Sequence, residues 1–458
     1  MITDAIGVYP VWQARDGQVV SSSFGALLAA LGRATVDPQC LYEYVFQGAT
    51  YGGRSLLREI ELLGPERALD AISEPGDSID HHLARNRDNL RAYYQAIARC
   101  FGDRIDTALS GGYDSRLTLG LLREQGITPK IHVYGRDGSP DVAVAKAIAA
   151  GEGFALSHED KSQAPRITPD RFQEVVGTNI LAFQAHPSDG IFDNGSDLET
   201  RRKRCAGDEL MLNGGGGEIF RNFFYLPDRE FRVEELLWTF YSQFDPKLCA
   251  GPFDELRYHR NLGLKVRRVL GRPDGMLSRL DVERLYPGFR CRFWMGKNNG
   301  INNQLGWALT PFIDANVVPS ALAIPLTLKT AGRFEARLIR AVDPALAAYA
   351  SDYGHSFAAD PPLAYRLKTQ LNQMRPPWLR RLTYRLKRRD RSNWPYTLGK
   401  DYLGRVIDTD FPYMRRFFKV DEIADAEPFK RIATLEYLLQ HSGAELPDVL
   451  ELPEETYD

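Results

Sequence analysis

The sequence predicts an α/β protein in which helices cover a parallel sheet and a mostly helical part follows it. Two observations indicate this class. From about residue 84, segments with helical and strand periodicity alternate, which is typical of βαβ units. After residue 230 the helical pattern dominates. The first 75 residues differ, because short strands and turns surround one helix there, so a small α+β segment is expected ahead of the sheet.

The N-terminal segment is expected to begin with a hairpin. Residues 6–11 and 18–22 have strand character, and Asp16-Gly17 between them is a strong turn signal. Residues 24–31 predict a short apolar helix that ends at Gly32. Two more apolar segments follow at 41–47 and 55–63, and the acidic, Pro/Gly-bearing stretch 71–82 is the expected linker.

The sheet region is predicted from periodicity and strand character. Leu90, Tyr94 and Ile97 lie on one face of a first helix. The expected elements are a helix over 86–101, a strand over 104–109, a helix over 115–125, a strand over 130–134 and a helix over 141–150. This order places the end of strand 104–109 at the edge where open parallel sheets bind ligands.

Composition excludes several classes. The 458 residues carry 58 basic and 60 acidic side chains, so no global field attracts nucleic acid or an acidic membrane. Five scattered cysteines without a CxxC pair argue against a disulfide framework or a cysteine zinc site. No apolar stretch of about 18 residues occurs, and the start Met1-Ile2-Thr3 lacks the form of a signal peptide. We therefore expect a multidomain cytoplasmic protein without membrane insertion and without a nucleic-acid partner.

The most informative segment is Leu109-Ser110-Gly111-Gly112-Tyr113-Asp114-Ser115-Arg116, between the strand 104–109 and the next helix. Its two glycines let the backbone approach a phosphate chain, and the helix start adds free N–H groups. Ser110 and Ser115 offer hydroxyl groups, and Asp114 is suited to Mg²⁺. The alternative is a Gly-Gly turn with an Asp/Ser helix cap. The segment is neither a G-x-G-x-x-G nor a Walker loop.

The segment is similar to the S-G-G-x-D-S loop of the N-type ATP pyrophosphatases. Gly7–Val11, Leu212–Phe220 and Pro311–Asp314 further resemble parts of the asparagine synthetases. The resemblance implies an adenine nucleotide alpha hydrolase-like ATP-pyrophosphatase domain over 84–360. It implies an Ntn-type glutaminase remnant over 1–83 and a helical extension, basic then acidic, over 361–458.

The resemblance also implies which residues bind ATP and Mg²⁺. Glu218 joins Asp114 as a metal ligand. The ATP-binding set is Leu109, Ser110, Gly111, Gly112, Tyr113, Asp114, Ser115, Arg116, Val133, Tyr134, Gly214, Gly215 and Gly216.

Departures from the family limit what is expected. No cysteine stands at the position of the glutaminase nucleophile, so glutaminase activity is not expected. The second glycine loop of the family corresponds to Leu212–Phe220, and its metal-binding Asp falls on Gly217. The late Lys that faces the triphosphate is absent. The candidates to replace it, or to act as a base, are Lys329, Arg333, Tyr353 and His355, beside Asp114 in the catalytic set.

The expected function is an ATP-dependent amide-forming ligase that adenylates a carboxylate, releases pyrophosphate and passes the acyl group to an amine or ammonia. Natural-product or polysaccharide tailoring fits such a relative, with a pathway protein as partner and a homodimer left open. The alternatives are a catalytically degenerate ATP-binding scaffold or regulatory subunit, and a peptide or β-lactam-type cyclase.

Two further stretches have alternative interpretations. The basic stretch 366–391 predicts amphipathic helices interrupted at Pro376-Pro377, or a dock for an anionic partner or pyrophosphate. The amide-rich run 298–304 is either a turn-rich loop or the polar wall of a substrate pocket.

Overall fold

A computed structural model describes residues 4–65, 67–72, 78–251, 253–386, 391 and 394–457, with Ser196 described by its backbone only. Three parts of the sequence predictions lie outside the described residues. They are the start at residues 1–3, where no signal peptide is expected, part of the predicted linker (73–77) and part of the basic stretch (387–390).

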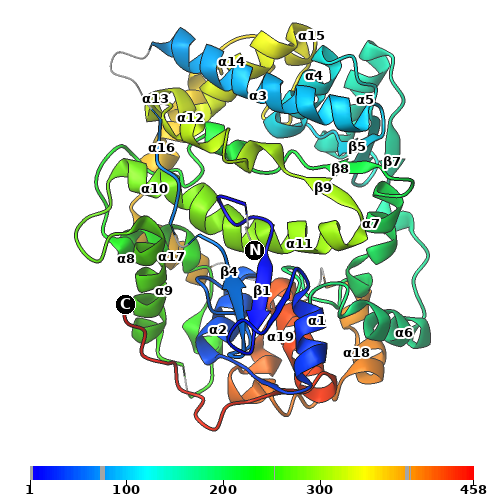
Figure 1. Cartoon of the computed structure of the whole chain (residues 1–458), viewed down its shortest axis with the longest axis vertical. Helices are drawn as coiled ribbons and strands as arrows, with labels where there is room; N and C mark the ends of the chain where they lie inside the picture. Colours follow the sequence, from blue (N-terminus) through cyan, green and yellow to red (C-terminus); the bar gives the residue numbers. More distant parts are fainter. Residues whose placement is uncertain are drawn as a thin grey trace.

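A five-stranded parallel sheet confirms the α/β class that the alternating periodicity predicted. It lies in the upper half of the molecule (Figure 1). The strand order is β7-β6-β5-β8-β9, and Thr107 of β5 pairs with Ile131 of β6 and Leu212 of β8. The strands are β5 (Ile105–Ala108), β6 (Lys130–Tyr134), β7 (Ser157–Glu159), β8 (Leu210–Leu212) and β9 (Trp307–Leu309). The chain reverses its direction of winding between β5 and β8, so the crevice for ligands lies at their carboxyl ends.

Helices pack on this sheet close to where periodicity placed them. The longest predicted helix begins earlier than expected, because Ser78 accepts a hydrogen bond from the amide of His81 and caps it. The predicted linker is therefore wrong over its last four residues. Of the helices around this sheet, α4 (Tyr113–Glu124) and α5 (Pro140–Glu152) contact its strands, and α3 (Ile79–Phe101), α14 (Arg333–Val342) and α15 (Pro344–Ala348) pack against α4.

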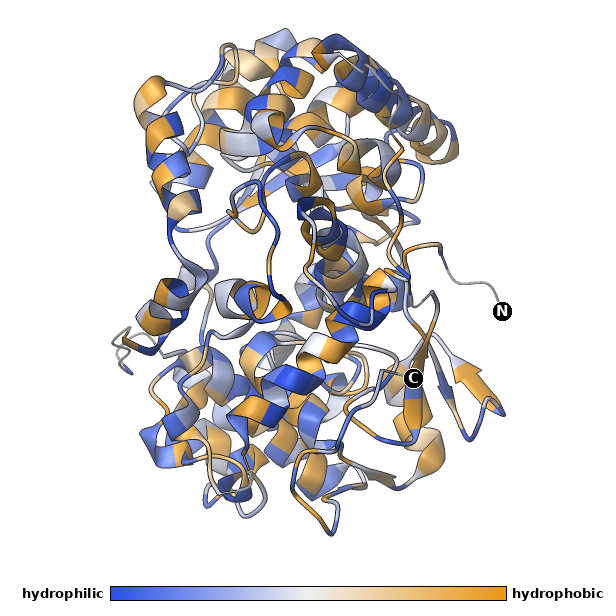
Figure 2. Ribbon diagram, turned by 90° about the vertical axis from the view of Figure 1, so that its left-hand side faces the viewer, coloured by the Kyte–Doolittle hydropathy of each residue, from blue (hydrophilic) through white to orange (hydrophobic). Residues whose placement is uncertain are grey.

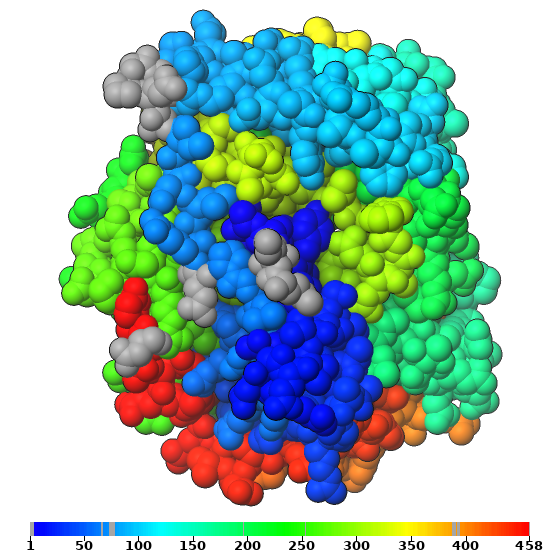
Figure 3. Space-filling model, in the orientation of Figure 1, coloured from blue at the N-terminus to red at the C-terminus, as the bar shows by residue number. Residues whose placement is uncertain are grey.

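The N-terminal hairpin and helix are confirmed. β1 (Val11–Ala14) pairs antiparallel with β2 (Val19–Ser21) and with β4 (Ile60–Leu63), and α1 spans Phe24–Leu31. The predicted first strand at 6–11 is wrong except at Val11, because the strand spans Val11–Ala14. Instead, the carboxylate of Asp4 accepts hydrogen bonds from four amides of residues 6–9 and so keeps them out of the ladder. Figure 3 shows the N-terminal hairpin and helix, in dark blue, on the front of the lower half.

Segments from the N-terminal and C-terminal parts of the chain pack together in the lower half (Figure 1). β10 (Ala444–Glu445) pairs in parallel with β3 (Ala34–Thr35), and α19 (Ala426–His441) packs on α2 (Pro38–Gln47). Lys265 of α9 (Glu255–Leu270) forms a fully buried ion pair with Glu43 of α2 at 2.8 Å. The N-terminal segment thus packs against the helical part, across the predicted boundaries at residues 83 and 360.

The rest of the described chain is mostly helical, as predicted. Figure 2 shows the upper and lower halves, with orange apolar residues spread through the helices of both. Across the described ranges, no helix combines the length and the hydropathy that crossing a bilayer requires. The other α-helices are α6 (Pro169–Asn179), α7 (Leu198–Arg204), α8 (Val233–Leu236), α10 (Arg279–Leu285), α11 (Gly296–Leu305), α12 (Val318–Leu322), α13 (Leu326–Lys329), α16 (Leu363–Met374), α17 (Pro377–Leu386) and α18 (Lys400–Val406).

Candidate functional site

The predicted phosphate loop links β5 directly to α4. The amide of Leu109 donates to the carbonyl of His132 and prolongs the pairing with β6. Gly112 is the N-cap of α4 and has no side chain to occupy the first amides of the helix. A helix start without a side-chain cap leaves N–H groups and a positive partial charge at the sheet edge. The loop is therefore suited to an anion.

The two serines of the loop lie together. Their Oγ atoms are 3.1 Å apart, and the amide of Ser110 donates to Oγ of Ser115 at 3.0 Å. The amide of Gly112 in turn donates to Oγ of Ser110 at 3.3 Å. Hydroxyl groups that are held by the loop backbone can donate to a ligand without first being ordered.

Two carboxylates flank the loop. The amide of Gly111 donates to Oδ1 of Asp141 at 2.8 Å. A Cβ atom on Gly111 would lie 2.9 Å from Cβ of Asp352, so only glycine fits here. Burial and the nearby Asp141 raise the pKa of Asp352. A phosphate that binds at this point must displace Asp141 from the Gly111 amide.

Arg116, expected among the ATP-binding residues, is fully buried below the loop. Its guanidinium donates to the carbonyls of Tyr349 at 2.9 Å and Ala350 at 2.7 Å, and lies 4.6 Å from the ring centre of Phe357. It therefore holds the segment 346–357 against the loop and does not face the loop mouth.

Asp114 is paired with Arg221, a residue that sequence reasoning missed. Nη2 of Arg221 lies 2.8 and 3.0 Å from the two carboxylate oxygens. Nε of the same guanidinium lies 3.0 Å from Oε2 of Glu335, and Nη2 lies 3.7 Å from Oε1 of Glu218. Nη1 donates to the hydroxyl of Tyr353 at 3.3 Å. One arginine thus joins both glycine loops and α14.

Three carboxyl groups surround this single guanidinium. Burial raises the pKa of Asp114 to about 6, although the charge of Arg221 opposes the shift. Burial also raises the pKa of Glu335, whose side chain is fully buried. The hydroxyl of Tyr286 donates to Oε2 of Glu218 at 2.5 Å. The cluster is therefore stabilised by protonation of a carboxyl group or by an added cation.

The expected magnesium ligands do not fit a metal ion in this arrangement. Both oxygens of Asp114 accept hydrogen bonds from Arg221. Over the described residues, no three His, Cys, Asp or Glu side chains are grouped to hold a metal. Glu218 and Asp114 meet through the arginine, so direct binding of Mg²⁺ by Asp114 requires that Arg221 move away.

The second glycine loop follows β8. Oδ1 of Asn213 accepts the amide of Gly215 at 2.9 Å, and Gly216 has a left-handed φ of 93°. Gly214 lies against the backbone of Asp114, and a Cβ atom on Gly217 would lie 2.4 Å from Oδ1 of Asp114. The absent side chain at residue 217 therefore makes room for the Asp114–Arg221 pair.

Two cavities flank the loops. The sheet-edge cavity, of about 380 Å³, lies at the carboxyl ends of β5, β6 and β8. The aromatic cavity, of about 410 Å³, lies beside Arg221. The sheet-edge cavity is lined by Ala108, Tyr134, Lys161, Arg201, Asn213 and Asn302. The aromatic cavity is lined by Tyr113, Glu218, Arg221, Phe240, Tyr353 and Tyr384. Both glycine loops contribute to the aromatic cavity, and the strands that they follow contribute to the sheet-edge cavity.

The amide-rich run is the wall of the sheet-edge cavity. It is helical rather than a turn-rich loop, because it forms most of α11. Nη1 of Arg201 donates to Oδ1 of Asn302 at 2.6 Å, and Nη2 donates to Oδ1 of Asn298 at 3.0 Å. Tyr134 lines the same cavity, whereas Val133 is buried in the sheet core.

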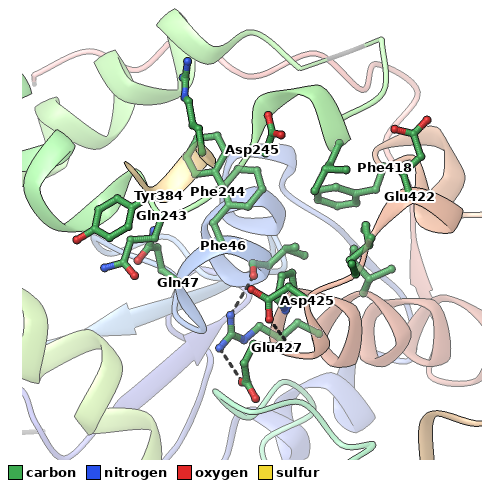
Figure 4. Close-up of a pocket in the computed structure, with 18 of the residues that line it drawn as sticks. Phe46, Gln47, Gln243, Phe244, Asp245, Tyr384, Phe418, Glu422, Asp425 and Glu427 are labelled. Atoms are coloured by element: carbon green, nitrogen blue, oxygen red, sulfur yellow. Dashed lines mark hydrogen bonds and ion pairs between the residues drawn. The ribbon is translucent and has the colours of Figure 1, made fainter. Parts of the chain in front are cut away.

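A third and larger cavity, of about 640 Å³, adjoins the aromatic cavity (Figure 4). Phe240, Gln243 and Tyr384 line both. Its floor includes the rings of Phe46 and Phe244, stacked with centres 3.8 Å apart. Side chains of both charges also line it: Asp245, Glu422, Asp425 and Glu427, with Arg290, Arg385 and Arg431.

The remaining predicted catalytic residues separate into two groups. Lys329 is fully buried, lines the aromatic cavity and pairs with Glu283 at 2.7 Å. The ring of His355 lies 4.8 Å from that of Tyr365, and burial lowers its pKa. Arg333 instead pairs with Asp360 at 3.2 Å and lines neither the sheet-edge nor the aromatic cavity. The structure thus brings Lys329 and Tyr353 to the aromatic cavity, which neither Arg333 nor His355 lines.

Comparison of the sequence with family models and with curated proteins identifies no relative of this chain. The chain matches no family model and no curated protein sequence.

Proposed function

We propose that the chain is an ATP-dependent ligase that activates a carboxylate as an acyl-adenylate and transfers it to an amine. One observation carries the proposal: the loop Ser110–Ser115 joins β5 to the uncapped start of α4 at the switch point of a parallel sheet. Paired hydroxyl groups, free helix amides and an adjoining cavity at that place favour a nucleotide phosphate chain.

The two cavities supply the two sides of such a reaction. The nucleoside binds in the sheet-edge cavity, where Tyr134 and Asn213 offer an aromatic face and an amide. The substrate carboxylate binds in the aromatic cavity, which the cations Arg221, Lys329 and Arg380 line. The α-phosphate then lies over the loop, between the two cavities.

In the first step, a carboxylate oxygen attacks the α-phosphorus. The bond from this phosphorus to the bridging oxygen of the β-phosphate breaks, and pyrophosphate leaves. In the second step the amine attacks the acyl carbon, AMP leaves with the former carboxylate oxygen, and the nitrogen loses a proton. The chain contributes positioning and charge: the loop amides and serine hydroxyls face the phosphates, and Arg221 orients the acyl group.

A second candidate is nucleotide binding without turnover. The hydrogen bonds from Arg221 to both oxygens of Asp114 favour it, because they occupy the carboxylate that would otherwise contact a metal-bound phosphate. In that case the loop binds the nucleotide and the chain acts as a regulatory or scaffold subunit.

ATP–pyrophosphate exchange distinguishes the two. We expect exchange with at least one member of a panel of carboxylic and amino acids, assayed with MgATP. Ser115→Ala should reduce this exchange by at least tenfold, because a donor to the phosphates is lost. Ser22→Ala, at an exposed serine of the N-terminal hairpin, is the matched control and should leave it unchanged. ATP binding by calorimetry without exchange or AMP for any substrate would favour the second candidate. Absence of ATP binding would refute both.

A further inference from the structure

The helices α16 and α17 expose a row of large apolar side chains. Leu371, for example, is 70% exposed, and Trp378 is 58% exposed. So many large apolar side chains close together are unusual on the surface of a protein. The two helices lie at the back of the view in Figure 1 and at the left-hand edge of Figure 2. The row consists of Leu363, Leu367, Leu371 and Met374 on α16, and Trp378, Leu382 and Leu386 on α17.

The spacing gives each helix one outward apolar face. Within α16 the exposed residues follow one another after four, four and three positions, and within α17 after four and four. Residues at these intervals share one side of a helix. The helices are interrupted at the predicted proline pair, since Pro376 lies between them and Pro377 begins α17, and Arg375 donates to the hydroxyl of Thr383 at 2.7 Å across the break.

The opposite faces anchor the pair on the body. The guanidinium of Arg380 is buried and donates to the carbonyl of Phe224 at 2.9 Å. The hydroxyl of Tyr384 donates to the carbonyl of Thr239 at 3.1 Å. Gln373, Arg380 and Tyr384 also line the aromatic cavity. The helices therefore form a wall of the candidate site with one face and present the apolar row with the other.

Basic residues accompany the row. Between residues 366 and 391 the sequence has ten Lys or Arg and one acidic residue, Asp390. Arg366 and Lys368 are exposed on α16. Arg381 and Arg385 share one partner, Glu255, so this stretch retains a positive charge.

We propose that α16 and α17 dock in the plane of an anionic lipid surface, with the apolar row in the acyl boundary and the basic residues at the head groups. An apolar face with leucine and tryptophan beside Lys and Arg is the pattern of interfacial helices. A second copy of the chain is disfavoured as the occupant, because it would bring the same basic residues together.

Vesicle sedimentation of the full chain tests it. We expect binding to vesicles of phosphatidylcholine with 30 mol% phosphatidylglycerol, at least tenfold weaker binding to phosphatidylcholine alone, and weakening by salt. Arg366→Gln with Lys368→Gln should weaken binding about tenfold, and Leu371→Asp should weaken it at least as much. Arg202→Gln with Lys203→Gln, at exposed positions of α7, and Leu256→Ser, at an 83% exposed leucine, are the matched controls and should bind like the wild type.

Two results would overturn the proposal. One is equal binding to neutral and anionic vesicles, or binding unaffected by both test variants. The other is a dimer of the wild type in solution that Leu371→Asp dissociates, which would make a second copy the occupant. Unfolding midpoints of all variants identify folding defects, and the double charge variant keeps the test valid if Leu371→Asp fails to fold.

Discussion

Nη2 of Arg221 lies 2.8 Å from one carboxylate oxygen of Asp114 and 3.0 Å from the other. The arginine comes just after the second glycine loop and the aspartate lies in the first, so the pair ties the two loops together. The same guanidinium reaches Glu335 of α14. The centre of the candidate site is therefore a mostly buried ion cluster with more carboxyl groups than cations.

Removal of Arg221 should destabilise the fold strongly. Arg221→Met leaves Asp114 and Glu335 buried without a cation, and we expect the free energy of unfolding to fall by about 3–5 kcal/mol. Glu335→Gln in the same chain should recover part of this loss. Urea unfolding at pH 7 measures both. A loss below about 1 kcal/mol for Arg221→Met would contradict the ion cluster.

A side chain at residue 217 should disturb the same pair. The Cβ atom of Gly217→Ala would lie 2.4 Å from Oδ1 of Asp114, so we expect a loss of about 1–3 kcal/mol from overpacking. Gly251→Ala is the matched control, because a Cβ atom there meets no atom within 4 Å. Its unfolding free energy should change by less than about 0.5 kcal/mol. Equal effects of the two substitutions in urea unfolding would refute the close approach.

The first glycine loop was predictable from the sequence because its signals are local. Strand character, the Gly-Gly turn and helical periodicity placed the β5–α4 junction within two residues of its bounds. Arg221 was not predictable, since its contact with Asp114 depends on how β8 packs beside β5. Arg116 adjoins the loop in sequence, yet burial directs it onto the carbonyls of 349 and 350. Likewise the two-residue pairing of β3 with β10 leaves no periodic signal.

The buried pair Lys265–Glu43 should hold the N-terminal segment on the helical part. Lys265→Met leaves the carboxylate of Glu43 buried and unpaired, and we expect a loss of about 3–5 kcal/mol. Lys203→Met is the matched control, because its pair with Glu199 is mostly exposed and should contribute less than about 1 kcal/mol. Denaturant unfolding measures both variants. A small loss for Lys265→Met would mean that the segment folds independently of α9.

Stability at mildly acidic pH should depend on His259. Burial lowers the pKa of this imidazole from its ordinary value of 6.5 to about 4, and a ring nitrogen lies 2.9 Å from the hydroxyl of Ser242. Glu255, which opposes the shift, and Arg381 and Arg385, which add to it, face the ring. Between pH 6.5 and 4 the unfolded chain binds a proton that the folded chain does not. Stability should therefore fall as the pH falls through this window, by at most about 1.4 kcal/mol per pH unit from this residue.

His259→Gln removes the titrating group, so the difference in unfolding free energy between variant and wild type should change across pH 7.5 to 4.5. Parallel pH profiles in urea unfolding would show that His259 titrates alike in both states.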